Sequence, residues 1–522
     1  MKWVAKLLLG ICTVVIVGPV SAAGLSEQQR ALHVLNRIGY GPKPGDVELV
    51  VNVGVERYIE AQLDPRRIPL PSSLSERLGN LTVPATPAGE LLAQFMAAQK
   101  AGKDDGEDGK QMRRATYQRI AEQTAEARLA RAIDSPRQLE EVMVDFWFNH
   151  FNVFAGKGLD RGLVTSYERD AIRPFALGRF RDLLGATAKH PAMLFYLDNW
   201  VSVASGYQPD TVRKQGAKAS GLNENYAREL MELHTLGVDG GYGQTDVTEL
   251  ARMFTGWTFN PRDMMRGGRT FAFDLRRHDS GDKHWLGHQV SAHGQDEGEW
   301  ALDVLASHPA TARHISYKLA QYFVADEPPA SLVKHLSERF VESKGDITAV
   351  LRTLLGSPEF WSPDHVGTKF KTPYQYVVST ARAAEVDVKN IRPLLGTLAQ
   401  LGMPLYGCPT PDGYKNTEQA WLNPDALTRR INFATALASG RLALEKPVDQ
   451  NDMNGMGKRQ LERMTRSDDS NPDRSAGNVV DAGRLMATLG STISQRTRST
   501  VANNPLPLRA ALLLGSPDFM RH

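Results

Sequence analysis

Acidic, amide and guanidinium side chains recur at helical spacing in the segment NENYARELMELHTLG. On a helix that turns by about 100° per residue, four polar side chains would fall within one quadrant: those of Asn225, Arg228, Glu229 and Glu232. Two carboxylates beside an amide and a guanidinium are suited to acid–base catalysis or to an oxygen-rich metal site. The same spacing makes Glu224, Arg228 and Glu232 consecutive i, i+4 neighbours, which is also typical of a salt-bridged surface helix.

A second candidate group lies in the segment FWFNHF, where Asn149 and His150 interrupt an otherwise apolar stretch. A histidine in an apolar pocket that faces Glu229 would be suited to act as a base or as a metal ligand. A histidine among aromatic residues can equally be a satisfied core residue. Asp198, in the segment YLDNW, adds a carboxylate ahead of the Glu229 helix, and this clustering of polar groups favours the catalytic interpretation.

Histidines and carboxylates are interleaved in the segment RRHDSGDKHWLGHQVSAHG. Imidazole and carboxylate ligands suit zinc or another divalent transition metal, and the candidate ligands are Glu224, His278 and Asp279. No spacing matches a strict zinc signature such as H-E-x-x-H, so an exposed polar turn is the alternative. Lys283 could hold a substrate anion or simply pair with Asp279.

Four of the eight tryptophans lie between residues 145 and 290. Their broad apolar faces could line a cleft for sugar rings, although tryptophans in a helical protein are commonly core residues. The sequence therefore nominates three groups of residues. The predicted catalytic residues are His150, Asp198, Arg228, Glu229 and Glu232, the predicted substrate-binding residues are Trp147, Asn149, Asn225, Trp257 and Lys283, and the predicted metal ligands are Glu224, His278 and Asp279.

Hydrophobic periodicity predicts that helices position these groups. Ser26 and Gln29 form a capping box at the start of the first helix, and Ser135-Pro136 opens the helix that carries His150. Two helices are expected within 87–133, separated near 101–111 by a charged, glycine-containing stretch typical of a mobile loop. Further helices are expected at 46–63, 165–174, 178–188, 223–236, 246–256, 298–306, 309–323, 330–342, 346–356, 371–384 and 424–438.

The expected exception to this helical pattern is a small β-hairpin around 269–290, where Phe271 and Phe273 alternate with polar residues before a turn. Apolar residues almost vanish from 448 to 477, which predicts a second mobile insertion. The sequence thus predicts a mostly α fold in which residues 23–522 form one large multi-helical domain.

The composition excludes several classes of protein. Hydrophobic residues make up 41% and charged residues 23% of the 522 residues, which excludes collagen-like, coiled-coil and wholly disordered chains. A formal net charge of +3, from 62 Lys and Arg against 59 Asp and Glu, gives no indication of a nucleic-acid partner. The chain has no GxSxG nucleophile elbow, and its glycine-rich stretch near residue 240 has no P-loop context.

Residues 1–22 have the pattern of a secretory signal peptide. Lys2 and Lys6 precede an apolar run, and Val20-Ser21-Ala22 supplies small residues for cleavage; an uncleaved anchor is the alternative. Cleavage would leave Cys408 as the only cysteine, which excludes an internal disulfide and a four-cysteine zinc site. No later stretch approaches membrane-spanning length, so we expect a periplasmic or extracellular protein with no stable membrane span.

Several motifs along the chain resemble those of one bacterial family. HVLNRIGYGPKPGDVE, FWFNHFNVF, NENYARELMELHTLGVDGGY, DVTELARMFTGWT and CPTPDGY are together similar to the domain-of-unknown-function 1800 family, from about His33 to the C-terminus. The resemblance implies a mostly helical secreted bacterial protein and supplies no reaction, cofactor or catalytic residues. Members are often encoded beside a secreted sulfatase-like family, which implies extracellular polymer metabolism.

The residues support two hypotheses of different classes. The first is a hydrolase-like enzyme acting on cell-envelope or extracellular polysaccharide, in which a carboxylate or a bound divalent metal activates water. This hypothesis requires the polar side chains to meet at a solvent-accessible site with unused acceptor capacity. The second is a non-catalytic helical binding or assembly factor of the cell envelope, whose polar groups form a satisfied structural network.

Overall fold

The computed structural model describes residues 24–208, 221–445 and 479–522. The predicted signal peptide at 1–22 and the predicted insertion at 448–477 lie outside the described residues. Within the described ranges, no helix combines the length and the apolar character that a membrane crossing requires.

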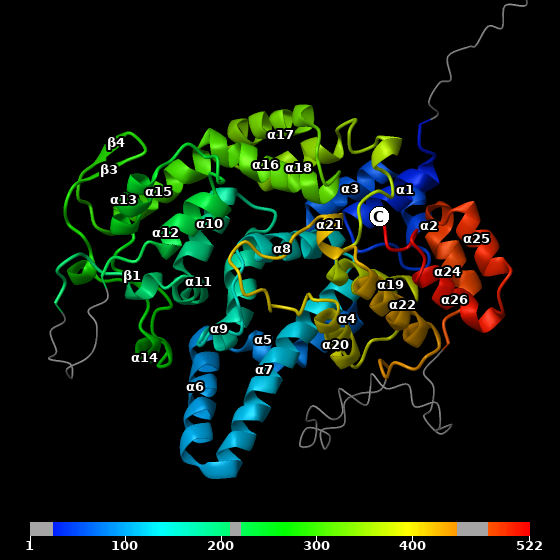
Figure 1. Cartoon of the computed structure of the whole chain (residues 1–522), viewed down its shortest axis with the longest axis horizontal. Coiled ribbons are helices and arrows are strands. Elements are labelled where there is room, and N and C mark those ends of the chain that lie inside the picture. The colour runs from blue at the N-terminus through cyan, green and yellow to red at the C-terminus, as the bar shows by residue number, and fades with distance from the viewer. Residues whose placement is uncertain (1–23, 209–220, 446–478) are drawn as a thin grey trace, which may run out of the picture.

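The described chain is built almost entirely of helices (Figure 1). The N-terminal helices are α1 (Glu27–Arg37), α2 (Asp46–Val53), α3 (Val55–Leu63), η1 (Pro65–Arg67), α4 (Ser72–Gly79), α5 (Thr82–Ala85), α6 (Ala88–Asp104), α7 (Gly106–Asp134) and α8 (Gln138–His150). The central helices are α9 (Asp160–Ser166), η2 (Tyr167–Ile172), η3 (Arg173–Phe175), α10 (Phe180–Lys189), α11 (Pro191–Tyr196), η4 (Asn199–Val201), α12 (Asn225–Glu229), η5 (Leu230–His234), α13 (Gln244–Met253), α14 (Pro261–Met264), η6 (Leu275–Arg277) and α15 (Gln295–Ser307). The C-terminal helices are α16 (Pro309–Phe323), α17 (Ala330–Glu342), α18 (Ile347–Leu355), η7 (Pro363–His365), α19 (Pro373–Ala383), α20 (Arg392–Gln400), α21 (Glu418–Trp421), α22 (Pro424–Ala438), α24 (Ala482–Leu489), η9 (Gly490–Thr492), α25 (Gln495–Ala502) and α26 (Leu506–Leu514). The prediction of a mostly α fold is confirmed.

The buried apolar residues of the described chain form one continuous cluster that runs from Val34 in α1 to Leu513 in α26. The C-terminal turn η9, between α24 and α25, packs against the N-terminal helix α1, and Figure 1 shows α24, α25 and α26 at this end of the molecule. Segments from near the two ends of the described chain therefore share one hydrophobic core.

Two small antiparallel sheets supply the β structure of the described chain. The hairpin within 269–290 consists of β3 (Lys283–Trp285) and β4 (His288–Val290). Leu286 and Gly287 join them, both at positive φ (47° and 78°), as a two-residue hairpin turn with the right-handed strand twist requires. The Phe271–Phe273 stretch takes no part in that hairpin, because β2 (Ala272–Phe273) pairs with β1 (Trp257–Thr258) instead.

Helices α6 and α7 form an antiparallel hairpin that projects from the body of the molecule (Figure 1). The prediction of a mobile loop near 101–111 is wrong, since both helices continue through this stretch and only Asp105 separates them. Gly106 makes the turn with a φ of +65°. Gly109 then lies so close to α6 that a Cβ atom would come within 2.0 Å of the Ala101 carbonyl oxygen. The glycines therefore allow two helices to meet tightly at a sharp turn.

Replacement of Gly109 by alanine should destabilise the α6–α7 hairpin by about 1–3 kcal/mol, because the new methyl group clashes with backbone that cannot move aside. At a helical glycine with free space around it, the same replacement normally stabilises the protein, because alanine is the better helix former by about 1 kcal/mol. Gly396 in α20 has nothing within 4 Å of its Cβ position and is the matched control. Hydrogen exchange of the α6–α7 amides should accelerate in Gly109→Ala, and slower exchange there would contradict the tight approach.

The helix predicted at 223–236 is present but changes type within its length. α12 ends at Glu229 and continues as the wider π-helical turn η5 from Leu230 to His234. A second π-helical turn, η2, covers Tyr167–Ile172. Such turns widen the helix and redirect side chains, and they occur frequently at functional sites. Glu232 and His234 are therefore displaced from the positions that a regular α-helix would give them.

Candidate functional site

The carboxylate of Glu224 belongs to a surface network at the start of α12. It accepts hydrogen bonds from Thr248 at 2.7 Å, Gln244 at 2.8 Å and Arg228 at 3.1 Å. The hydroxyl of Thr248, and then the other donors, lower the pKa of Glu224 despite its partial burial. Glu224 and Arg228 are thus the i, i+4 pair of a surface helix, and they fasten α12 to α13.

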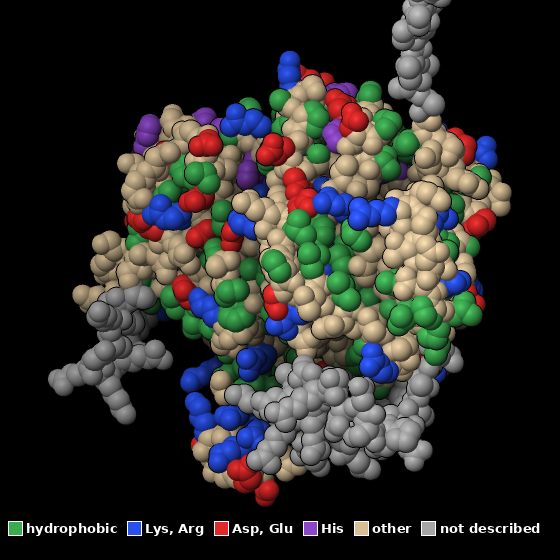
Figure 2. Space-filling view, turned by 45° about the vertical axis from the view of Figure 1, so that its right-hand side comes forward, with side chains coloured by type: hydrophobic (Ala, Val, Ile, Leu, Met, Phe, Trp, Pro, Cys, Tyr) green, Lys and Arg blue, Asp and Glu red, His purple; other side chains and the backbone are tan. Residues whose placement is uncertain are grey.

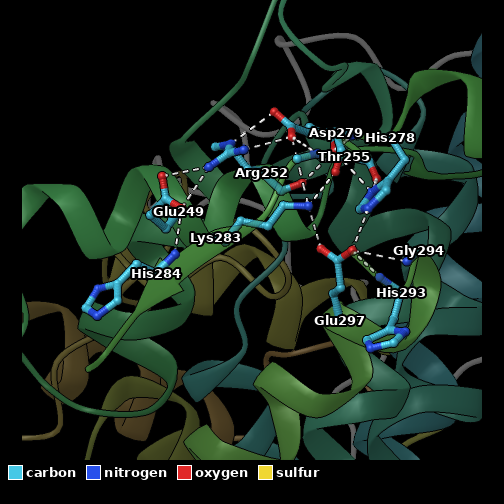
Figure 3. A network of polar contacts seen from close by, with 11 residues as sticks. Glu249, Arg252, Thr255, His278, Asp279, Lys283, His284, His293, Gly294 and Glu297 are labelled. Carbon is cyan, nitrogen blue, oxygen red and sulfur yellow. Dashed lines mark hydrogen bonds and ion pairs between the residues drawn. The ribbon is translucent and has the colours of Figure 1, made fainter. Parts of the chain in front are cut away.

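His278 lies at the centre of a buried polar network between η6, β3 and α15 (Figure 3). Its Nδ1 lies 2.9 Å from the Thr255 carbonyl oxygen and its Nε2 lies 3.1 Å from a carboxylate oxygen of Glu297. Because a carbonyl oxygen only accepts, Nδ1 carries a proton. Both ring nitrogens therefore have partners within the protein.

Lys283 and Asp279 complete this network with charged groups (Figure 3). The Lys283 ammonium lies 2.7 Å from Glu297, and neither side chain is exposed. Asp279 accepts two hydrogen bonds from Arg252, at 2.9 and 3.0 Å. Burial alone would raise the pKa of Glu297, but the bonds from His278 and Lys283 lower it overall.

The predicted metal ligands do not meet at one point. Glu224 pairs with donors at the start of α12, whereas His278 and Asp279 have separate partners in the Figure 3 network. Among the described residues, no set of three or more His, Cys, Asp or Glu side chains is arranged to hold a metal ion. Glu297, which the sequence analysis missed, is recognisable only as the N3 residue after Gly294 at the start of α15.

The two predicted substrate-binding tryptophans are core residues. Trp147 is fully buried and its indole N–H donates to the Ala176 carbonyl oxygen at 2.9 Å. Trp257 is also fully buried, with its ring packed so closely on α15 that a Cβ at Gly298 would lie 2.5 Å from it. Neither ring lines an accessible surface in the described structure.

Asn149 and Asn152 hold the segment 408–414, which contains the CPTPDGY motif, against the end of α8. The Asn149 side chain donates to the Tyr414 carbonyl oxygen at 2.8 Å and accepts from the Tyr414 N–H at 2.7 Å. The Asn152 amide donates to the Thr410 carbonyl oxygen at 2.8 Å. Asn149 therefore positions this segment through paired backbone bonds.

Two further predicted residues have local partners. Asp198 has a φ of 59° and its carboxylate pairs with Lys157 at 2.9 Å. Asn225 is exposed, and its side-chain amide donates to the Leu197 carbonyl oxygen at 3.4 Å. Both residues thus contribute to the connection between α11 and α12.

Glu229 and Glu232 differ from the other predicted carboxylates because they have no hydrogen-bond partner among the described residues. Both are partly exposed. Burial, and next the negative charge of Glu232, raise the pKa of Glu229, and Asp412 contributes in the same direction. Glu229 therefore has unused acceptor capacity and faces the segment that Asn149 holds in place.

Asp412 is a carboxylate at this place that the sequence analysis did not nominate. Its partial burial would raise its pKa, but donors from Lys415, at 2.7 Å, and Thr410 lower the pKa overall. Glu229 and Asp412 thus have pKa values shifted in opposite directions. Such a difference between neighbouring carboxyl groups allows one to act as an acid while the other is ionised.

Three histidine rings lie close together where α8, η5 and α16 meet. The His150 ring is 6.0 Å from the His234 ring and 6.3 Å from the His314 ring, measured between centroids. His150 Nε2 lies 3.1 Å from the His234 carbonyl oxygen, and His314 Nε2 lies 3.2 Å from the Leu233 carbonyl oxygen. Burial lowers the pKa of all three, to about 3 for His234 and about 4 for His314. The three rings are therefore neutral at pH 7.

A buried ion network joins α8 to α7 and η2. Arg128 pairs with Asp145 and, at 3.1 Å, with Glu168, which also accepts from the Tyr406 hydroxyl at 2.7 Å. A cavity of about 20 Å³ lies beside it, with polar lining from Arg128, Asp145, Asn149, Asn152 and Tyr406. That volume suits a single water molecule. The cavity is therefore too small to be a substrate pocket. The ion network beside it links α7 and α8 close to Asn149.

Comparison with protein families places the whole sequence in one family. A family model described as "Protein of unknown function (DUF1800)" matches residues 33–521. No curated protein matches the chain, and no solved structure matches it. The match covers nearly the whole chain, so the protein belongs to the DUF1800 family, and the resemblance inferred from the motifs is confirmed.

Proposed function

We propose that this DUF1800 protein is an exported hydrolase-like enzyme that cleaves cell-envelope or extracellular polysaccharide by carboxylate acid–base chemistry. In this proposal Glu229 donates a proton to the leaving oxygen, and ionised Asp412 activates water or stabilises the developing positive charge. The supporting observation is that Glu229 is unpaired among the described residues and has a raised pKa, whereas the pKa of nearby Asp412 is lowered.

The surroundings of Glu229 support this division of roles. Asn149 fixes the segment that carries Asp412, and the π-helical turn places Glu232 where its charge favours a proton on Glu229. An acid must be protonated to act, so activity should fall as the pH rises through the pKa of Glu229. It should fall at low pH as Asp412 becomes protonated.

Glu229→Gln is expected to reduce product formation by about 100-fold or more, because general acid catalysis contributes a factor of that size. The measurement is the release of new reducing ends from a panel of purified bacterial envelope and extracellular polysaccharides. The variant should keep its free energy of unfolding within about 0.5 kcal/mol, since the Glu229 side chain has no hydrogen bond to lose among the described residues.

Glu224→Gln is the matched control, because it removes a carboxylate from the same helix that is already engaged by three donors. It should leave the rate close to that of the wild type. Wild-type turnover by Glu229→Gln would exclude the proposed role. A collapse of stability in that variant with unchanged polysaccharide binding would instead make the carboxylate architectural.

Export and the polysaccharide substrate belong to the same proposal. Export is supported by the signal-peptide pattern of residues 1–22. A polymer substrate is supported by the partial exposure of Glu229, Glu232 and Asp412 on the surface, where an extended chain can reach them. These arguments for export and for a polymer substrate do not depend on Trp147 and Trp257, which lie in the core.

A non-catalytic binding or assembly factor is the second candidate, and the projecting α6–α7 hairpin favours it. An open groove of about 560 Å³ lies along α6, lined by Met96, Lys100, Lys103 and Met265 among others. Figure 2 shows Lys and Arg side chains on this projection and acidic side chains near its tip. This alternative predicts no hydrolysis by the wild type, together with envelope-polymer binding that Glu229→Gln leaves unchanged.

A further inference from the structure

Helix α16 brings a lysine close to Asp412 and a histidine against the π-helical turn that follows Glu229. His314 and Lys318 are one turn apart on α16 and therefore share a face of the helix. His314 contacts the Leu233 carbonyl oxygen of the π-helical turn at 3.2 Å, and its ring lies 6.3 Å from that of His150. Lys318 is thus directed to the region where α8, η5 and the segment 408–415 meet.

The ammonium group of Lys318 has no hydrogen bond or ion pair within the described part of the chain. The side chain is only partly exposed, so water solvates it incompletely. A partly desolvated charge with no partner is unfavourable unless a ligand supplies one. Burial, followed by the positive charge of Lys415, lowers the pKa of Lys318 to about 8, while Asp412 opposes the shift.

The neighbouring groups do not neutralise this charge. His150, His234 and His314 are neutral at pH 7 because burial lowers their pKa values. Asp412 is the carboxylate whose charge acts on Lys318, but it already pairs with Lys415 at 2.7 Å. Lys318 therefore lies near Asp412 of the proposed acid–base pair, with no partner among the described residues.

We propose that Lys318 binds an oxyanion substituent of the substrate, so that the polymer held at Glu229 and Asp412 is an acidic one. This inference rests on the proposed function, which assigns Glu229 and Asp412 as the acid–base pair that holds the polymer. A carboxylate, sulfate ester or phosphate ester would supply the acceptor oxygens that the ammonium lacks.

Binding to matched polymers tests this inference with the full chain. Carboxymethyl-dextran and dextran sulfate share a backbone with neutral dextran, so they isolate the contribution of the oxyanion. We expect the wild type to bind at least one acidic polymer, and Lys318→Gln to weaken that binding about 10-fold or more, as for loss of a charge-assisted hydrogen bond. Lys318→Arg should retain most of the affinity because it keeps the positive charge.

Lys334→Gln is the control for net charge, because Lys334 is 79% exposed on the neighbouring helix α17. It should bind like the wild type. Binding of carboxymethyl-dextran alone would identify a carboxylate, binding of dextran sulfate alone would identify a sulfate, and binding of both would identify oxyanions generally. Equal binding of neutral dextran, no binding of either acidic polymer, or unchanged affinity in Lys318→Gln would overturn the inference.

A second readout separates this inference from the proposed function. When lysines are ¹³C-dimethylated, which preserves their charge, acetate or sulfate should shift the Lys318 resonance saturably in both the wild type and Glu229→Gln. The resonance is identified by its absence from Lys318→Arg. Anion binding without hydrolysis would overturn only the proposed function. Glu229-dependent hydrolysis with no role for Lys318 would overturn only the present inference.

Discussion

Replacement of Lys283 by methionine is expected to lower the free energy of unfolding by about 3–5 kcal/mol, the usual cost of removing one partner of a buried ion pair. The variant leaves Glu297 as a fully buried carboxylate without the ammonium that lies 2.7 Å away. The backbone N–H groups of His293 and Gly294 still donate to Glu297, but they are neutral and do not replace the charge of the Lys283 ammonium. Urea unfolding at pH 7.5 measures the loss.

Two controls decide whether the buried pair causes this effect. Lys334→Met removes a lysine that is 79% exposed and should change the free energy of unfolding by less than about 0.5 kcal/mol. Adding Glu297→Gln to Lys283→Met should recover part of the lost stability, because the buried group is then uncharged. A loss below about 1 kcal/mol in Lys283→Met, or a double variant less stable than the single one, would contradict this account.

Local signals in the sequence were sufficient to predict most helices. The capping box of Ser26 and Gln29 is present, with the Gln29 N–H donating to the Ser26 hydroxyl at 3.3 Å. The stretch near 101–111 could not be assigned in this way, because charged residues and glycines suit both a loop and a tight helical turn. The choice depends on how closely Gly109 approaches Ala101 on the neighbouring helix, which is a tertiary contact.

The candidate site was predictable only in part, for a similar physical reason. Helical spacing identified Glu229 and Glu232, but it could not distinguish them from Glu224, whose partners Gln244 and Thr248 come from another helix. Asp412 lies in a loop far along the chain and reaches the site through backbone contacts to Asn149. Residue types and spacing do not encode such pairings, so the acid–base partner of Glu229 could not be nominated from the sequence.

A second large effect is expected in acid, where the protein should lose several kcal/mol of stability between pH 7.5 and pH 5. Burial lowers the pKa of His33, His190 and His234 to about 3, and that of His150 well below its ordinary value. These rings are neutral in the folded protein but take up protons near pH 6.5 once unfolded. Their contribution to stability is present above pH 6.5 and is lost as the pH falls towards 3.

The magnitude follows from the number of protons. Each such histidine costs about 2 kcal/mol over this interval, and His314 and His522, whose pKa values burial also lowers, add to the four. Asp160 acts in the opposite direction. Its carboxyl has no hydrogen-bond partner among the described residues, and burial raises its pKa well above the usual value. The folded state therefore binds this proton at a higher pH than the unfolded chain does. Because the buried histidines outnumber Asp160, unfolding takes up protons overall, and the expected loss is a large fraction of the stability of a typical domain.

Urea unfolding at several pH values measures this uptake, since each proton contributes a slope of about 1.4 kcal/mol per pH unit. His190 provides a specific test, because its Nδ1 accepts the Ala192 N–H at the start of α11. His190→Asn keeps an acceptor for this cap but cannot titrate, so the slope should fall by one proton with little loss at pH 7.5. His190→Ala should show the same reduced slope with about 1 kcal/mol less stability at every pH, because the cap is lost. An unchanged slope in both variants would mean that His190 is already protonated in the folded protein and that its burial does not control acid stability.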